Sequence, residues 1–384
     1  YTTLFRSGHW LNCLIASLNW MSGGVLGVPP RGEMNALQKD LVGTLEESMV
    51  LIDRFSQENF TDESMRAFWS RRIVNAYGEE CHSAQKIRWA NLIHSLPPKG
   101  LAGIVRGEES CTGGVRDFLI NPAKYLKPVR EWVYMPPPRI FVDEDDWPEV
   151  AAGLIDRGIC EPFPLKDVIR VDGKPMVGGL FGVPKNENVD GVDVLRLIMD
   201  LRPVNSMFQS IVGDMSTLPM LSQLQPLELY PNETLLISSE DIKAMFYVVS
   251  LGSVWRPLLC FGRVLPPELS PDPHEEYVLS SLVLPMGFIN SVAVAQALHR
   301  GIVHAAMDKH KVSRSFEIRR DQPLPQESLG YRIYLDNFDL LRRTNPEAAS
   351  LLDGTLDPLA GALREEYSRH KVPRNLKSLR KVNL

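Results

Sequence analysis

The chain has 384 residues, of which 44% are hydrophobic and 23% charged, a composition typical of a globular protein with more than one domain. A formal net charge of −5 and a pI near 6.0 are not those of a strongly basic nucleic-acid-binding protein. The five cysteines are scattered and form no CxxC pair, so they suggest neither a disulfide framework nor a zinc site. They indicate a reducing, intracellular setting, with cytoplasm and nucleus not distinguished. No apolar run is long enough to span a membrane.

The first part of the chain is predicted to be helical. Residues 1–7, YTTLFRS, resemble the translation of a common sequencing adapter, so we interpret them as a cloning scar and leave them out of the fold. Apolar residues recur at helical spacing in 36–57 and 62–95, which predicts a helical N-terminal region over residues 8–112. The glycine and proline clusters that follow predict a linker over residues 113–142.

From residue 143 onward, short apolar runs alternate with turns. The segment 146–164 predicts a capped amphipathic helix that ends at Gly158. Strands are expected at 180–184, 195–201, 234–239, 257–261 and 277–284 and on both sides of a hairpin within 331–341, and helices at 242–249, 290–309 and 346–368. Strands and helices mixed in this order predict an α+β fold, in which helices cover one face of a mainly antiparallel sheet.

Two carboxylates stand at the ends of these expected strands. Asp241 ends the run TLLISSED, and Asp336 lies in the hairpin YRIYLDNFDLL. An Asp-Asn pair is also ordinary turn chemistry, because both side chains bond nearby backbone groups. If the two strands are neighbours, the carboxylates form an oxygen site suited to Mg²⁺, and two such ions support in-line phosphoryl displacement.

Several segments, taken in chain order, resemble the motifs of one family. GLIDRGICEP, FGVPK, LRLIMDLRPVNS, SSEDIKAMFYVVSL, LPMGFINSVAVAQALHR and YLDN resemble the fingers and palm of reverse transcriptases of the retrotransposon and retrovirus kind. The resemblance implies a right-hand polymerase over residues 143–384, with fingers and an antiparallel palm sheet backed by helices, truncated before or within the thumb. The lack of an initiator Met fits a piece of a longer open reading frame.

The resemblance also implies roles for single residues. Asp241, Asp336 and Asn337 are expected to hold two Mg²⁺ or Mn²⁺ ions, and Lys377 to protonate the departing pyrophosphate. The nucleotide-binding residues implied by the same motifs are Lys185, Arg196, Phe246, Met286, Gly287 and Gln296. The bulk of Phe246 is expected to exclude a 2′-hydroxyl, and the guanidinium of Arg196 to bind the triphosphate.

Simpler interpretations of these residues stay open at this point. Phe246 also suits plain core packing, Arg196 a solvated strand end and Gln296 a surface position. Lys185 is separated from Arg196 by the insertion NENVDGVDV. Asn337 stands where the family usually has a second Asp, which removes a negative charge within reach of the metals. Two milder departures are Met286 in place of a frequent Gln and Val292 in place of a frequent Pro.

The expected partners are an RNA template, a DNA primer or RNA–DNA hybrid and deoxynucleoside triphosphates, with no membrane and an undetermined oligomeric state. The net charge is compatible with nucleic-acid binding if acidic residues such as the cluster DEDD at 143–146 lie outside the binding groove. The basic end of the chain from residue 367 has two open interpretations, the start of the primer-binding side and a solvated end. Two alternatives remain. One is a catalytically inactive, nucleic-acid-binding relic, for which Asn337 is the main reason. The other is an RNA-dependent RNA polymerase, which usually carries a second Asp at the position of Phe246.

Overall fold

The computed structural model describes part of the chain. The described residues are 84–384 except 225, 226, 228, 326, 352–356, 376–380 and 384. The chain divides between Cys81 and His82, and every described residue belongs to the second unit. The scar expected at 1–7, the helix expected at 36–57 and Lys377 lie outside the described residues.

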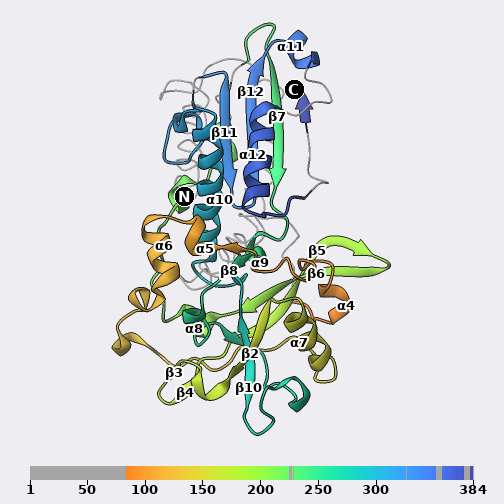
Figure 1. The fold of residues 1–384 in the computed structure, drawn as a ribbon, viewed down its shortest axis with the longest axis vertical. Helices are drawn as coiled ribbons and strands as arrows, with labels where there is room; N and C mark the ends of the chain where they lie inside the picture. The colour runs from red at the N-terminus through yellow and green to blue at the C-terminus, as the bar shows by residue number, and fades with distance from the viewer. Residues whose placement is uncertain are drawn as a thin grey trace, which may run out of the picture. The chain divides into compact units, whose positions relative to one another are not determined.

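The described part mixes helices and strands, which confirms the α+β class predicted from the sequence (Figure 1). Its helices are α4 (Trp89–Leu92), α5 (Gly107–Ser110), α6 (Gly113–Ile120), α7 (Trp147–Asp156), α8 (Arg202–Asn205), α9 (Met245–Val248), α10 (Ser291–Lys309), α11 (Pro346–Leu351) and α12 (Pro358–Arg369). Its longer strands are β2 (Cys160–Pro164), β5 (Gly179–Val189), β6 (Val192–Asp200), β7 (Thr234–Asp241), β10 (Tyr277–Ser281), β11 (Leu329–Tyr334) and β12 (Asn337–Thr344). Shorter strands are β1 (Val105–Arg106), β3 (Arg170–Val171), β4 (Lys174–Pro175), β8 (Val249–Ser250), β9 (Cys260–Phe261) and β13 (Lys381–Asn383).

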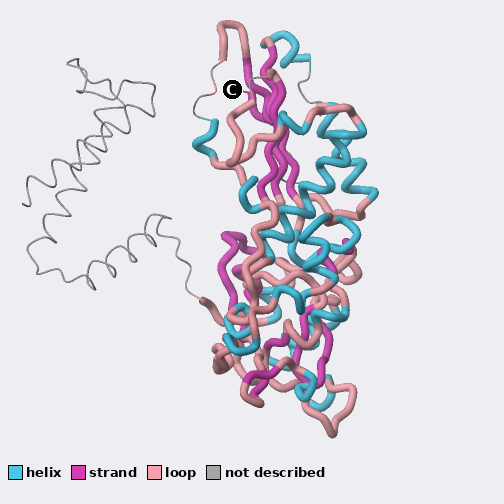
Figure 2. The backbone as a smooth tube through the Cα atoms, turned by 90° about the vertical axis from the view of Figure 1, so that its left-hand side faces the viewer, coloured by secondary structure: helices cyan, strands magenta, loops and turns pink. Residues whose placement is uncertain are grey.

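One antiparallel sheet carries both predicted carboxylates. Its strand order is β11-β12-β7-β13, so the hairpin of β11 and β12 lies against β7. Helices α10 and α12 lie side by side and cover one face of this sheet (Figures 1 and 2). The fully buried Tyr331, Phe338 and Leu340 supply part of the core of this layer. The C-terminal ends of β7 and β11 point to the same end of the sheet (Figure 1).

The predicted fingers strands and the residues between them form one long hairpin. Strand β5 pairs with β6, and Val189 is the Cα partner of Val192 across the turn. The turn residues Asp190 and Gly191 both have positive φ, 52° and 82°. That conformation is a type I′ turn, for which Asp-Gly is a preferred pair. The insertion NENVDGVDV is therefore the tip of this hairpin. A separate sheet has the order β2-β10-β9.

Residues expected to form a linker contribute to the core instead. Helix α6 begins at Gly113, and its Phe118 is fully buried. Phe118 packs edge-on against Phe208 and Trp255 and stacks on Phe288, with ring centroids 5.0–6.2 Å apart. The indole nitrogen of Trp255 donates to the carbonyl of Leu119 over 2.8 Å. Helix α6 is thus tied to residues on both sides of β10 in the sequence, and the described part of the chain before residue 143 belongs to the same unit as the rest.

Several predicted elements differ in extent from those observed, and three of them are shortened or divided. The helix expected at 242–249 is a single turn, α9, because Ala244 has a φ of 56° and breaks the helical path before it. The helix expected at 346–368 is two helices, α11 and α12, since Asp357 caps a new start by accepting a hydrogen bond from the amide of Leu359. Of the strand expected at 257–261, only β9 forms.

The described cysteines are Cys111, Cys160 and Cys260, and all are free and buried. Burial raises the pKa of Cys111 and of Cys260 to about 12, so both thiols stay protonated at neutral pH. Among the described residues, no helix combines the length and the apolar character that crossing a membrane requires.

Candidate functional site

The hairpin of β11 and β12 brings Asp336 to the end of β7. Tyr334 pairs with Asn337, so Leu335 and Asp336 form a two-residue turn. Asn337 is in turn the Cα partner of Asp241. Beyond that pair, the amide of Ile242 donates to the carbonyl of Asp336 over 2.9 Å. Directly opposite residues of an antiparallel pair have Cα atoms about 4.5–5.5 Å apart, so Asp241 and Asp336 are close neighbours.

The pKa values of both carboxyl groups are raised. Burial raises the pKa of Asp336, and the nearby charge of Asp241 raises it further. Burial also raises the pKa of Asp241, against the hydrogen bond from Asn375 and the positive charge of Lys185, which lower it. Raised pKa values mean that the negative charges are incompletely compensated by the surrounding groups. A bound cation would relieve this cost.

The donor set at this end of the sheet fits Mg²⁺ better than a transition metal. The described residues contain no group of three or more His, Cys, Asp and Glu side chains placed to hold a metal. Two carboxylates with an amide oxygen nearby are the hard oxygen donors that Mg²⁺ uses when substrate phosphates complete its shell. The amide nitrogen of Asn337 donates to Asp336 Oδ1 over 2.9 Å. An amide in this place supplies an oxygen without a charge.

The β5–β6 hairpin places two cations beside these carboxylates. Arg196 pairs with Val183, and Lys185 lies two residues beyond Val183, where the regular pairing of β5 with β6 is interrupted. The charge of Arg196 lowers the pKa of Asp336, and that of Lys185 lowers the pKa of Asp241. Arg196 is exposed and makes no ion pair with any described residue. The two cations of this hairpin therefore act on the same pair of carboxylates.

Asn375 is a site residue that the sequence did not single out. Its backbone amide donates to the carbonyl of Asp241 over 2.9 Å, and its side-chain amide donates to Asp241 Oδ2 over 3.0 Å. The preceding Arg374 bonds Glu240, the residue before Asp241. The chain after α12 thus holds Asp241 by both its carboxylate and its backbone carbonyl. Asn375 lies two residues before Lys377, the residue of this segment that the resemblance singled out.

Helix α10 holds the turn that carries Asp336. The amide of Leu335 donates to Gln296 Oε1 over 2.8 Å, and Gln296 Nε2 donates to the carbonyl of Ile333 over 3.0 Å. His299 Nδ1 lies 2.5 Å from the carbonyl of Leu335. Gln296 is fully buried, so the surface position left open by the sequence is wrong. Both polar atoms of its side chain bond the backbone around the turn, because Leu335 lies against this face of α10.

The predicted pocket residues Phe246 and Met286 are both partly buried against the core. Phe246 belongs to the one-turn helix α9, which is anchored to the neighbouring strand because the Tyr247 hydroxyl donates to the carbonyl of Leu197 over 2.8 Å. The carbonyl of Met286 accepts a hydrogen bond from the amide of Met199, the penultimate residue of β6. Both residues therefore lie beside β6, the strand that carries Arg196.

Gly287 is required by a protein contact. Its φ is 111°, and a Cβ there would lie 2.1 Å from the carbonyl oxygen of Met199. We expect Gly287→Ala to lower the free energy of unfolding by the ~1–2 kcal/mol of a left-handed residue plus ~1–3 kcal/mol of overpacking. Gly173→Ala is the matched control, because Gly173 has a φ of 74° with open space around it. Equal losses for the two variants in urea unfolding would contradict the contact.

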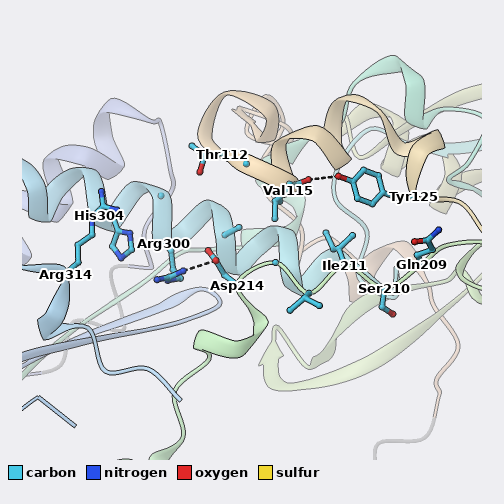
Figure 3. Close-up of a pocket in the computed structure, with 16 residues that line it drawn as sticks. Thr112, Val115, Tyr125, Gln209, Ser210, Ile211, Asp214, Arg300, His304 and Arg314 are labelled. Carbon is cyan, nitrogen blue, oxygen red and sulfur yellow. Dashed lines mark hydrogen bonds and ion pairs between the residues drawn. The ribbon is translucent and has the colours of Figure 1, made fainter. Parts of the chain in front are cut away.

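A separate cavity of about 680 Å³ lies between α6, the loop 209–214 and α10 (Figure 3). Its charged side chains already have partners: Arg300 bonds Asp214 over 2.9 Å and pairs with the buried Glu317, and Arg314 pairs with Asp308. Because the charges compensate one another, the cavity offers no free charge for a ligand. Neither Asp241 nor Asp336 lines it.

Comparison with known proteins adds no assignment. A scan against protein-family models finds no match to this chain, and a search of curated proteins finds none either. The inference of a function therefore depends on the residues at the ends of β7 and β11.

Proposed function

We propose that residues 143–384 form the fingers and palm of an RNA-directed DNA polymerase, which adds deoxynucleotides to a primer 3′ end by a two-metal mechanism. The observation that supports this most is the pairing of Asn337 with Asp241, which places the carboxylates of Asp241 and Asp336 at one end of one sheet. Lys185 on β5 and Arg196 on β6 add positive charge beside the same two carboxylates. A palm fold is part of this proposal.

In this proposal each group has a defined task. Asp241 and Asp336 hold the metals, and Asn375 and the α10 side chains keep the two carboxylates in place. Two Mg²⁺ ions bound there would stabilise the attacking and leaving oxygens of the phosphoryl transfer. Arg196 and Lys185 neutralise and orient the triphosphate, since guanidinium and ammonium groups are its natural partners. RNA template and DNA primer are bound through their backbones, without reading of base sequence.

The bulk of Phe246 is proposed to select the sugar. Phe246→Ala should raise ribonucleotide incorporation relative to deoxynucleotide by about 10–200-fold, the range that a single apolar pocket contact contributes to discrimination. The change opens a clash and deletes no charge, so deoxynucleotide use should fall only modestly. Steady-state incorporation of each nucleotide measures the ratio. Phe316→Ala, which truncates another partly buried Phe packed on the core, is the control and should leave discrimination unchanged. The same result for both variants would assign Phe246 to the core.

Primer extension by the full chain tests the function directly. Poly(rA)/oligo(dT) with deoxythymidine triphosphate, first in Mg²⁺ and then in Mn²⁺, is the simplest substrate. Extension that requires the metal and prefers deoxynucleotides supports the proposal. Extension with ribonucleotides only would instead favour an RNA-dependent RNA polymerase.

The second candidate is a nucleic-acid-binding relic without catalysis. One observation favours it: the Asn337 amide donates a hydrogen bond to Asp336, so the turn is stabilised without a metal. Such a protein should bind an RNA–DNA hybrid but leave the primer unextended in both metals. Hybrid binding measured by fluorescence anisotropy, beside the extension assay, separates the two candidates.

A further inference from the structure

Behind the turn that carries Asp336, a chain of buried polar groups runs from α10 to α12. His299 Nδ1 contacts the carbonyl of Leu335 at 2.5 Å, and His299 Nε2 contacts the hydroxyl of Tyr367 at 2.6 Å. His299 and Tyr367 are both fully buried. His299 lies near the end of the motif LPMGFINSVAVAQALHR but was given no role there, and Tyr367 lies outside every quoted motif.

The contacts determine the tautomer of His299. A backbone carbonyl only accepts hydrogen bonds, so Nδ1 must carry the proton and donate it to Leu335. The neutral ring then has a lone pair on Nε2, which accepts from the Tyr367 hydroxyl. Burial lowers the pKa of His299 to about 4, so the ring is neutral at pH 7. In this series of hydrogen bonds, each ring nitrogen of His299 is therefore either a donor or an acceptor, and never both.

The turn needs this support because its backbone is strained. Leu335 has a φ of 53°, a left-handed conformation that is unfavourable for a residue with a Cβ. Its amide is held by Gln296, its carbonyl by His299, and the next carbonyl, that of Asp336, by the amide of Ile242. Once these peptide groups are fixed, the direction in which the Asp336 side chain leaves the turn is fixed as well.

We propose that His299 and Tyr367 are positioning residues for the metal site: His299 fixes the Leu335 carbonyl, and with it Asp336, while Tyr367 fixes the orientation of the His299 ring. The inference rests on the proposed function, because it assigns Asp336 to a metal. Neither residue touches the metal or the substrate. Their loss should therefore weaken metal binding while the rest of the fold remains.

We call the hydrogen-bonded series from Leu335 through His299 to Tyr367 the relay. Three variants of the full chain test it. Tyr367→Phe removes only the hydroxyl that His299 accepts from, and His299→Leu removes both contacts. Tyr331→Phe is the matched control, because Tyr331 is equally buried in β11 and its hydroxyl has no hydrogen-bond partner among the described residues. Thermal unfolding of each variant shows whether the chain is folded, and Tyr367→Phe keeps the test valid if His299→Leu fails to fold.

The measurements are Mn²⁺ affinity by electron paramagnetic resonance and the His299 tautomer by ¹⁵N NMR. Loss of an outer-shell partner typically weakens metal affinity about 10–100-fold, and we expect His299→Leu near the lower end, with a smaller loss for Tyr367→Phe. Tyr331→Phe should bind Mn²⁺ as the wild type does. The wild-type spectrum should show the proton on Nδ1.

Each other outcome overturns a different statement. Equal Mn²⁺ affinity of Tyr367→Phe and Tyr331→Phe, with the wild type binding Mn²⁺, would refute the relay and leave the polymerase proposal intact. A proton on Nε2 of His299 would refute the relay on structural grounds. A wild-type chain that binds no Mn²⁺ would remove the metal site itself, and the polymerase proposal and the relay would both fall.

Discussion

Asp336→Asn is expected to abolish primer extension in Mg²⁺ and in Mn²⁺ while making the metal-free protein more stable. Loss of a metal-binding carboxylate removes several kcal/mol of transition-state stabilisation, a rate loss on the order of 10³-fold or more. Single-turnover extension on poly(rA)/oligo(dT) measures the loss. Asp241→Asn should behave in the same way.

The expected gain in stability follows from the raised pKa of Asp336. A carboxyl whose pKa is higher in the folded protein than in the unfolded chain binds its proton more tightly when folded. As the pH rises through the interval between the two pKa values, ionisation costs folding free energy, and the full cost is present above the folded pKa. Asn carries no charge, so Asp336→Asn should raise the melting temperature at pH 7 without metal. The difference from wild type should vanish below the ordinary carboxyl pKa.

Asp190→Asn is the matched control for this prediction. It makes the same chemical change in another two-residue hairpin turn, at an exposed residue with a φ of 52°. Both its activity and its stability should stay near those of the wild type. Equal, measurable extension by the wild type and by Asp336→Asn would refute the metal role of Asp336. Lower stability of Asp336→Asn at pH 7 would show that the carboxylate serves the turn.

The sequence predicted the elements that carry a strong local pattern. The apolar runs ending at Asp241 and flanking Asp336 are strands, β7, β11 and β12, and the long apolar segment after Asn290 is α10. These runs are identifiable because a buried strand or helix needs apolar residues at fixed spacing. The pairing of β7 with β12 did not follow from the sequence, since spacing along a chain does not say which strands are neighbours.

The residues that hold the carboxylates were not predictable in this way. Asn375 and Tyr367 reach the site through contacts between distant segments, and neither lies in a pattern that differs from ordinary surface or core residues. Ala244 adopts positive φ although alanine has no preference for it, so the shortening of α9 had no local signal. The sequence does not predict the core role of α6, because a glycine pair is typical of a linker, whereas Gly113 and Gly114 begin a helix whose Phe118 is buried.

The second large effect is expected from restoring the missing charge in the hairpin. Asn337 is exposed and pairs with Asp241, so Asn337→Asp would add a third carboxylate at the end of the sheet. A unit charge ~4 Å from an ion is worth about 1 kcal/mol in bulk water and about 4 kcal/mol at an effective dielectric of ~20. Because Asn337 is exposed, we expect an interaction free energy in the lower half of this range. A gain of that size corresponds to a roughly 10-fold tighter Mg²⁺ affinity. Extension at limiting Mg²⁺ should rise accordingly.

Without metal the same substitution should act in the opposite direction. It removes the amide that donates to Asp336 Oδ1 and places a third negative charge beside two carboxylates whose pKa values are already raised. The metal-free melting temperature should therefore fall, and its increase on addition of Mg²⁺ should be larger than in the wild type. Thermal unfolding over a range of Mg²⁺ concentrations measures both. An unchanged response to Mg²⁺ would place Asn337 outside the metal site, and a tighter Mg²⁺ response without any primer extension would favour the inactive relic.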